Sequence, residues 1–315
     1  MAAEPDDKTI NDESGNVYHV PVLLNESVDA LNIQPSGIYV DCTFGGGGHS
    51  ALILQQLDAK GRLYVFDQDA DARKNVPEDP RITFIPNNFR HLQRFLRLNK
   101  VQEVNGILAD LGVSSHQFDD ASRGFSTRFD SDLDMRMDTR QELTAYKVVS
   151  GYSEERLHKI FEQYGEVSNS KTLAKTIVAV RNTVSLQTIA NFKSALHGIV
   201  KGNPNKYFAQ VFQALRIEVN DELGALKELL EQLPKVLVQG GRAVMITFHS
   251  LEDRLVKNYF RKGTFEDAED ANPFTNTISK ALLKPVLKKP VVAGAEEIKR
   301  NPRARSAKMR VAEKI

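Results

Sequence analysis

Short apolar runs alternate with helical stretches in the first third of the chain. The strand-like runs cover residues 38–40, 63–66, 82–85 and 106–111, with helical stretches between them at 50–57 and 91–98. Strands that alternate with helices form βαβ units, in which neighbouring strands run parallel. The pattern therefore predicts an α/β fold with an open parallel sheet.

This alternation stops between residues 138 and 208, where no strand-like run is found. Helical patterns fill the stretch instead, at 142–149, 153–163, 171–181 and 186–200. Ser153 is a typical N-cap residue for the second of them. We therefore expect an all-helical insertion at 138–208 within a discontinuous domain made of residues 14–137 and 209–315.

The sheet pattern returns after one strongly amphipathic segment. Apolar residues recur at steps of three or four from Phe208 to Leu233, which predicts a single helix that ends at Pro234. A strand-like run follows at 242–248, and a last β-type segment at 306–311 reads as an edge strand.

Composition places few limits beyond those of an ordinary globular protein. The 315 residues carry 42 Lys+Arg and 41 Asp+Glu, and 41% of them are hydrophobic. The single cysteine, Cys42, excludes an internal disulfide and a Cys-rich zinc site, and it suits a reducing compartment. No apolar run approaches the roughly 18 residues of a membrane span. With an acidic, polar start in place of a targeting signal, these features predict a cytoplasmic protein.

The two ends of the chain carry opposite charge. Residues 1–13, expected to be a flexible acidic N-terminus, hold five acids and one lysine, a net charge of −4. Residues 284–315 hold ten Lys/Arg and three acids, a net charge of +7. Such a basic tail is typical of contact with phosphates, and a solvated tail that maintains solubility is the alternative.

A cluster of four glycines, Gly45 to Gly48, follows the first predicted strand. A glycine-rich turn between a strand and a helix brings backbone N–H groups close to a ligand. The third glycine of a dinucleotide fingerprint would fall on Ser50, so a nucleoside without a pyrophosphate fits better. Asp67 ends the next strand, where an acid accepts hydrogen bonds from ribose hydroxyls. A purely structural turn is the alternative.

Eight motifs in order carry a specific resemblance to a known family. They are YHVPVLLNE at 18–26, GGGGHS at 45–50, ADLGVSS at 109–115, RGFS at 123–126, LDMRMD at 133–138, FQALRIEVN at 212–220, FHSLEDR at 248–254 and NPRARS at 301–306. Together they resemble the ribosomal RNA small-subunit methyltransferase H family over residues 18 to about 313.

The resemblance implies an enzyme that transfers a methyl group from S-adenosylmethionine to N4 of a cytidine in the decoding region of 16S rRNA. It implies a class I methyltransferase-like (Rossmann-like) parallel sheet, with the helical insertion serving substrate recognition. The expected partner is 16S rRNA or the small ribosomal subunit. A homodimer is compatible with it, and neither a metal nor a membrane is expected.

The resemblance also assigns site residues. The cofactor would be bound by Gly47, Gly48, His49, Asp67, Phe89, Asp110 and Gln117. Asp110 would also be catalytic, as an acceptor for the hydrogens of the target amine, or it would only hold the amino group of the cofactor. The candidates for substrate binding are Arg123, Arg136, His249, Arg303 and Arg305.

Several of these residues could instead have purely structural roles. His49 at a helix start could cap that helix, and Ser250 with Asp253 forms a capping pattern beside His249. Arg123, Arg136 and also Arg216, a further candidate for phosphate contact, could make internal ion pairs. Cys42 is interpreted as packing, because methylation at N4 needs no cysteine nucleophile.

Two stretches depart from the family pattern, and they lie mostly in the helical insertion. Residues 206–210 (KYFAQ) replace a His-Pro-Ala-Thr-Arg-like run, and residues 167–169 (VSN) replace a Glu-Arg-Phe-like one.

The runner-up function is that of a methyltransferase for another RNA base or for a protein. The alternative from a different class is a catalytically silent ribosome-assembly factor. The presence of Gly47, Asp67 and Asp110 together argues against it.

Overall fold

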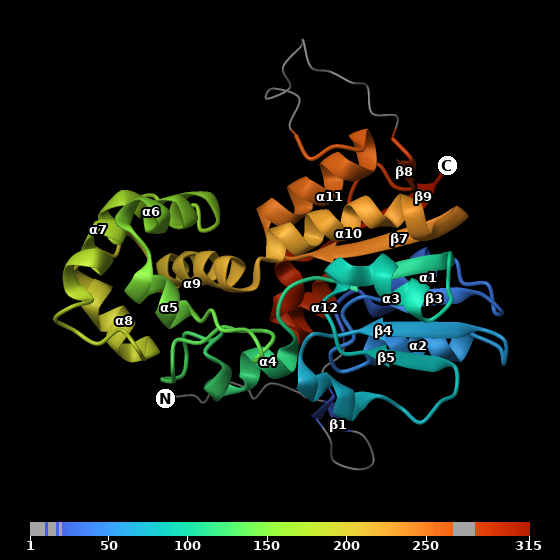
Figure 1. Ribbon diagram of the computed structural model, residues 1–315, viewed down its shortest axis with the longest axis horizontal. Helices are drawn as coiled ribbons and strands as arrows, with labels where there is room; N and C mark the ends of the chain where they lie inside the picture. Colours follow the sequence, from blue (N-terminus) through green and yellow to red (C-terminus); the bar gives the residue numbers. More distant parts are fainter. Residues whose placement is uncertain (1–9, 12–16, 19–20, 267–280) are drawn as a thin grey trace, which may run out of the picture. The chain divides into compact units, whose positions relative to one another are not determined.

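The computed structural model describes residues 10–11, 17–18, 21–266 and 281–315. The chain forms two compact units, one of Met1–Gly112 with Ala225–Ile315 and one of Val113–Gly224 (Figure 1). Most of the predicted acidic N-terminus lies outside the described residues. Of it, Ile10–Asn11 (β1) pairs antiparallel with Val17–Tyr18 (β2).

The first unit is built on a seven-stranded sheet in the order β5-β4-β3-β6-β7-β9-β8. Its strands are β3 (Ile38–Asp41), β4 (Arg62–Phe66), β5 (Ile82–Ile85), β6 (Val104–Asp110), β7 (Leu237–Thr247), β8 (Leu283–Pro285) and β9 (Lys308–Lys314). The first five run parallel, β9 pairs antiparallel with β7, and β8 pairs antiparallel with β9. This confirms the predicted α/β fold with a largely parallel, Rossmann-like sheet.

One strand differs in position from its prediction. The β-type segment expected at 306–311 is not an edge strand, because β9 lies between β7 and β8. The true edge strand, β8, has only three residues and includes Pro285, so its apolar pattern is too short to be recognised.

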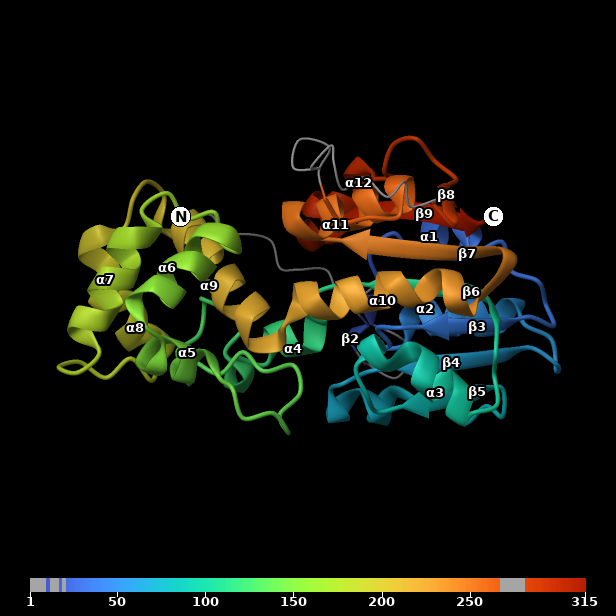
Figure 2. The ribbon, with the colours of Figure 1, turned by 45° about the horizontal axis from the view of Figure 1, so that its top comes forward.

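Helices cover both faces of this sheet (Figure 2). They are α1 (Leu24–Ala30), α2 (Gly48–Gln56), α3 (Leu92–Leu98), α10 (Glu222–Val236), α11 (Ser250–Lys262) and α12 (Ala295–Arg300), with short 3₁₀ turns at Ala70–Asn75, Phe89–His91 and Pro302–Ser306. Alternate residues of β7 serve the two faces. Ala243 and Met245 pack with α3, α10 and α11, whereas Val244 and Ile246 pack with α1 and α2.

The strand order reverses between β3 and β6. The chain builds β3, β4 and β5 outward in one direction and then returns to place β6 on the other side of β3. Open parallel sheets bind their ligands at the carboxyl ends of strands at such a reversal. The two strands end here at Asp41 and Asp110.

The second unit is helical. Its helices are α4 (Ser115–Asp119), α5 (Ala145–Gly151), α6 (Glu154–Gln163), α7 (Ser170–Val180), α8 (Ile189–Leu196) and α9 (Pro204–Asn220), with 3₁₀ turns at Ala121–Arg123 and His197–Ile199. Ser153 caps α6 as predicted, its side chain accepting from the Arg156 N–H. The unit is wider than the expected insertion, because residues 125–137 and 211–219 share its apolar core.

The single helix predicted from Phe208 to Leu233 is wrong. Two helices occupy this stretch, because Asp221 takes the left-handed conformation (φ 47°) and ends α9. Asp is one of the few residues that adopt this conformation readily. Pro234 does not end α10 but lies within its last turn. The spacing of apolar residues continues across Asp221, so periodicity alone does not reveal the break.

Asn220 is the last residue of α9, and both the oxygen and the nitrogen of its side-chain amide make two hydrogen bonds. Its Oδ1 accepts from Met137 N–H at 2.7 Å and from Gln141 Nε2 at 3.2 Å, and its Nδ2 donates to the carbonyls of Met135 and Arg216 at 2.8 and 2.9 Å. Because Asn220 is buried, its side chain is held by these protein partners rather than by solvent.

We expect Asn220→Asp to lower the free energy of unfolding by about 2–4 kcal/mol, because a carboxylate oxygen would then face two carbonyls. Urea unfolding followed by circular dichroism measures the change. The control is Asn191→Asp on the exposed face of α8, which should leave the midpoint unchanged. A midpoint in Asn220→Asp equal to that of the control would contradict the structural role.

Candidate active site at the carboxyl edge of the sheet

The glycine turn, which follows β3, is fastened to the end of β4. Phe44 N–H donates to the carbonyl of Phe66 at 2.9 Å, and Gly45 N–H donates to Asp67 Oδ2 at 2.8 Å. Gly47 has a φ of 79° and precedes the first turn of α2. A Cβ at Gly48 would overlap the ring of Pro21, whereas one at Gly46 would meet nothing within 4 Å. The turn therefore needs glycine for its shape at Gly47 and for close packing at Gly48.

Asp67 directs its carboxyl toward this turn. Besides the bond from Gly45, its Oδ1 accepts from Asp69 N–H at 2.8 Å, so each oxygen takes one backbone donor and can accept another. Burial raises the pKa of Asp67 to about 6, although the N–H groups of Asp69 and Gly45 lower it in part. The carboxyl is ionised at neutral pH and titrates just below it.

Asp110 ends β6 with an acceptor that lacks a partner. Its Oδ1 is buried and has no hydrogen bond within the described part of the chain. Burial, together with the nearby carboxyls of Asp41 and Glu252, raises the pKa of Asp110 well above its ordinary value. This is a carboxyl poised to bind a donor or a cation.

His49 lies beside Asp110 and does not cap α2. Its Nε2–H donates to the carbonyl of Val22 at 3.2 Å, and its Nδ1 lies 4.0 Å from Asp110 Oδ2. Burial lowers the pKa of His49, so the ring is neutral with a lone pair on Nδ1. A neutral His49 does not lower the pKa of Asp110, which agrees with the raised pKa of that carboxyl.

Asp41 supports the turn from beneath. It is buried, its Oδ2 accepts from Ser50 Oγ at 2.7 Å, and its Oδ1 accepts from Thr43 N–H at 3.0 Å. The neighbouring Cys42 is buried as well, and burial raises its pKa well above the ordinary value, as does Asp41. A thiol kept protonated in this way fits the interpretation of Cys42 as packing.

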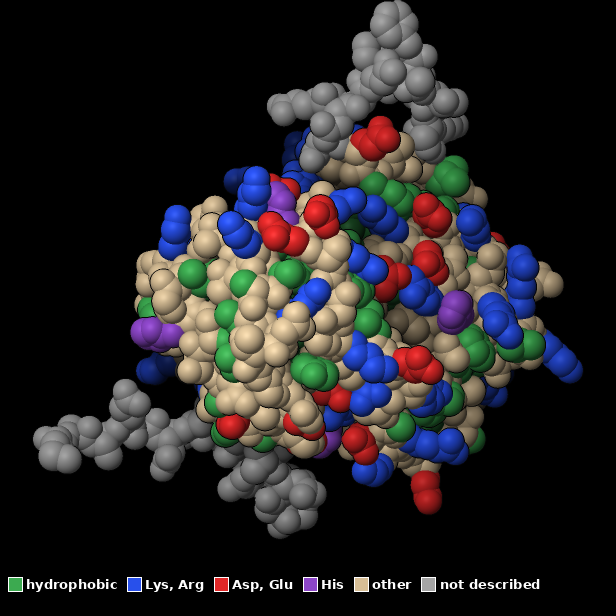
Figure 3. Space-filling view, turned by 60° about the vertical axis from the view of Figure 1, so that its left-hand side comes forward, with side chains coloured by type: hydrophobic (Ala, Val, Ile, Leu, Met, Phe, Trp, Pro, Cys, Tyr) green, Lys and Arg blue, Asp and Glu red, His purple; other side chains and the backbone are tan. Residues whose placement is uncertain are grey.

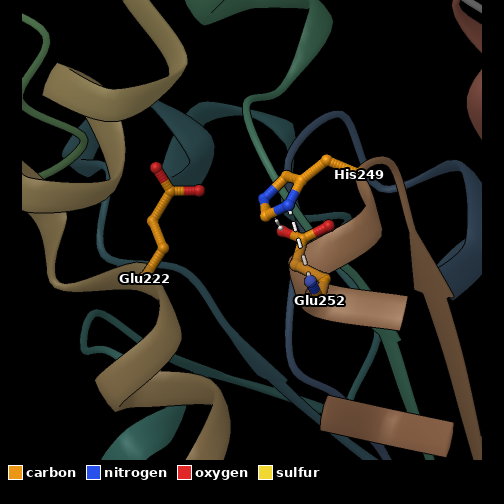
Figure 4. A group of neighbouring side chains, drawn as sticks. All are labelled: Glu222, His249 and Glu252. Atoms are coloured by element: carbon orange, nitrogen blue, oxygen red, sulfur yellow. Dashed lines mark hydrogen bonds and ion pairs between the residues drawn. The ribbon is translucent and has the colours of Figure 1, made fainter. Parts of the chain in front are cut away.

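His249 and Glu252 form a buried pair at the start of α11 (Figure 4). His249 Nδ1 accepts from Glu252 N–H at 3.5 Å, and Glu252 Oε1 lies 3.2 Å from His249 Nε2. Glu252 Oε2 accepts from Phe248 N–H at 2.9 Å. The N-cap is thus His249 rather than Ser250, which is the first residue of the helix. His249 stays a prediction for substrate contact.

Phe89 follows β5 in a 3₁₀ turn and is half-buried against the core. Gln117 belongs to the second unit, where its side chain accepts from Ser114 N–H at 3.1 Å in a capping box at the start of α4. The five other cofactor candidates, Gly47, Gly48, His49, Asp67 and Asp110, lie together at the carboxyl edge of the sheet.

The arginines of the second unit have internal partners. Arg123 is buried and donates to the carbonyls of Arg136 and Met137 at 3.0 and 3.1 Å. Arg136 makes a two-pronged pair with Asp134 at 2.8 and 2.7 Å, and Arg216 makes one with Glu222 at 2.8 and 3.0 Å. These contacts favour the internal role that the sequence left open.

The basic tail is part of the folded first unit. Arg310 pairs with Asp253 at 2.6 and 3.1 Å, and Lys308 Nζ lies 3.3 Å from the same carboxylate. Arg305 is exposed and Arg303 is half-buried in the turn before β9. The exposed cations of the tail therefore lie ahead of β9.

Sequence reasoning missed three site residues: Asp41, Thr43 and Glu252. The first two carry a signal, since Asp-x-Thr after a strand favours a turn in which the Asp side chain accepts from the N–H two residues on. The same spacing recurs at Asp67 and Asp69. Glu252 carries none, because only the fold brings it near Asp110.

Comparisons with known proteins agree on one family. The model of the MraW methylase family matches residues 16–315. A ribosomal RNA small subunit methyltransferase H from Phocaeicola vulgatus is 54% identical over 303 residues, which cover 96% of this chain and 99% of that protein. The protein of the same name from Parabacteroides distasonis is 53% identical, over 96% of this chain and 100% of that one.

Likeness to solved structures is much lower. A solved rRNA methylase from Streptococcus thermophilus has 12% identity and a TM-score of 0.40, over 95% of this chain and 99% of that one. The matches in sequence extend over nearly the whole chain and include both units. The chain belongs to the MraW methylase family.

Proposed function

We propose that this protein transfers a methyl group from S-adenosylmethionine to N4 of a specific cytidine in the decoding region of 16S rRNA. Membership of the MraW family makes it a methyltransferase that uses S-adenosylmethionine. The observation that carries the proposal is the glycine turn between Asp67 and Asp110, at the reversal of the strand order. The relatives named above are small-subunit rRNA methyltransferases.

The residues at this edge suit the cofactor. Asp67 has a free acceptor position on each oxygen for the two ribose hydroxyls, and Gly47 and Gly48 admit the amino-acid portion close to the backbone. Phe89, at the end of β5, offers an aromatic face to the adenine. The carboxyls of Asp41 and Glu252 raise the pKa of Asp110, so a cation beside Asp110 would be favoured. When bound, the cofactor supplies a methyl group activated on a positively charged sulfur.

Asp110 is the group we assign to the target amine. Transfer to an exocyclic amine requires the nitrogen to be held in line with the methyl group, with acceptors for its hydrogens. The unpartnered Oδ1 of Asp110 is such an acceptor. The cytidine must leave its stack to reach this edge. Cys42 takes no part, since its thiol is buried and protonated.

RNA contacts are assigned to the basic tail and to the helical second unit. On the face drawn in Figure 3, Lys and Arg are interspersed with Asp and Glu, so charge alone does not mark one RNA-binding surface there.

No helix within the described ranges is long and apolar enough to cross a membrane. We place the protein in the cytoplasm, where its rRNA substrate is found.

The proposed function is tested by incubating the full chain with labelled S-adenosylmethionine and small ribosomal subunits lacking the modification. Digestion of the rRNA to nucleosides should give label in N4-methylcytidine alone. Label in another nucleoside or in protein would support the runner-up activity. The absence of label from every fraction would support a silent assembly factor.

In the same assay Asp110→Ala tests the assigned acceptor, because it removes both carboxyl oxygens. We expect kcat and kcat/KM to fall together by roughly 100-fold or more, because the lost contact is made chiefly in the transition state. Affinity for the subunit should be unchanged. A variant with the turnover of the wild type would remove Asp110 from the chemistry.

The pKa of about 6 at Asp67 makes cofactor affinity depend on pH. The carboxylate accepts the ribose hydroxyls, so affinity should be full above about pH 7 and fall by up to about tenfold per unit as the pH drops through and below this pKa. Titration calorimetry between about pH 5 and pH 8 measures it. Asp67→Asn should bind roughly 100-fold more weakly at pH 8 and lose this dependence. A variant that keeps the full dependence would assign it to another group.

Neutralising Arg303 and Arg305 to Gln should weaken binding to the subunit and flatten its salt dependence. Each lost phosphate contact lowers the slope of log K against log salt by roughly 0.7–0.9. Lys308 is left intact because it faces Asp253. The matched control is Arg97→Gln with Lys100→Gln. These two exposed cations precede β6, at the amino ends of the parallel strands. If log K falls with log salt at the same slope in both double variants, the tail only maintains solubility.

A further inference from the structure

The hydroxyl of Thr43 connects the glycine turn to the end of β6. Its Oγ1 accepts from Asp110 N–H at 2.7 Å and lies 3.5 Å from Asp41 Oδ1. The backbone N–H of Thr43 donates to the same Asp41 oxygen at 3.0 Å. One side chain therefore accepts from Asp110 and donates toward Asp41.

This bond stands where the ladder between β3 and β6 ends. Asp41 pairs with Leu108, and Cys42 N–H donates to the Leu108 carbonyl at 2.8 Å. In a regular parallel ladder the next donor, Asp110 N–H, would bond to the carbonyl of Cys42. Here it bonds to the hydroxyl of Thr43, which replaces the last backbone acceptor where the two strands separate.

Asp41 extends the same connection to α2. Its second oxygen accepts from Ser50 Oγ, in the first turn of that helix, at 2.7 Å. Because Asp41 is buried, its two oxygens are held by these donors rather than by solvent. The end of β6, the glycine turn and the start of α2 thus share one continuous set of hydrogen bonds.

We propose that Thr43 is a positioning residue for methyl transfer, whose hydroxyl holds Asp110 in register with the glycine turn. The inference rests on the proposed function, in which Asp110 receives the target amine and the turn holds the cofactor. In-line transfer is sensitive to small displacements of either group. In this role Thr43 acts through Asp110, whose N–H donates to its hydroxyl.

Thr43→Val removes the hydroxyl and keeps the shape of the side chain, so it leaves Asp110 N–H without its acceptor. We expect kcat to fall by roughly 10-fold or more while KM for the subunit stays within about twofold. Hydrogen–deuterium exchange gives a readout that needs no turnover. The Asp110 amide should exchange about tenfold faster in Thr43→Val, with or without cofactor.

Thr43→Ser restores an acceptor and should return both kcat and exchange to within about threefold of the wild type. The matched control is Thr247→Val. Thr247 is buried at the end of β7, and its hydroxyl donates to the Lys308 carbonyl at 3.2 Å. This control loses one hydrogen bond between strand ends of the same sheet, yet it should keep the wild-type kcat and Asp110 exchange.

Three outcomes would overturn the inference: wild-type kcat and exchange in Thr43→Val, no recovery in Thr43→Ser, or an equal loss of kcat in Thr247→Val. Failure of the wild type to methylate subunits is a different result. It would contradict the proposed function and the positioning role for methyl transfer with it, whereas the exchange measurement would still show whether Thr43 holds Asp110.

Discussion

Acidic side chains at the carboxyl edge of the sheet must be held together against their mutual repulsion. Asp41 and Asp110 end β3 and β6, Asp67 directly follows the neighbouring β4, and burial makes each charge costly. Backbone N–H groups of the adjoining turns offset this cost for Asp41 and Asp67. The positive φ of Gly47 and the close approach of Gly48 to Pro21 belong to the same tight turn. Asp110 alone keeps an unpartnered oxygen, and that exception marks where chemistry is expected.

The second unit uses its charged residues differently. Arg123, Arg136 and Arg216 are the cations that motif matching singles out, and each is bonded within the unit. With Asn220 they fix irregular segments that a helical core cannot order by apolar packing alone. The motif residues of this unit therefore stabilise its own structure. Side chains that contact RNA must be sought among its exposed residues.

Much of the fold could be predicted from the sequence because its strands are short, apolar and bounded by turns. The pattern located β3 to β7 and the glycine turn, since both depend on local chemistry. It could not show the break at Asp221, where a single left-handed residue preserves the apolar spacing. Nor could it decide whether Arg123 is paired or locate Glu252 beside Asp110, because those facts depend on contacts between distant segments.

The position of β9 has a consequence for the order in which the protein is made. This strand comes from the last residues of the chain, yet it lies inside the sheet, between β7 and β8. While the chain is being synthesised, β7 is without its neighbour on one side until Lys308–Lys314 has also been made. The helical unit, whose residues are continuous in sequence, emerges before that and has all its own core available. We therefore expect the sheet to reach its final form after the helical unit has folded.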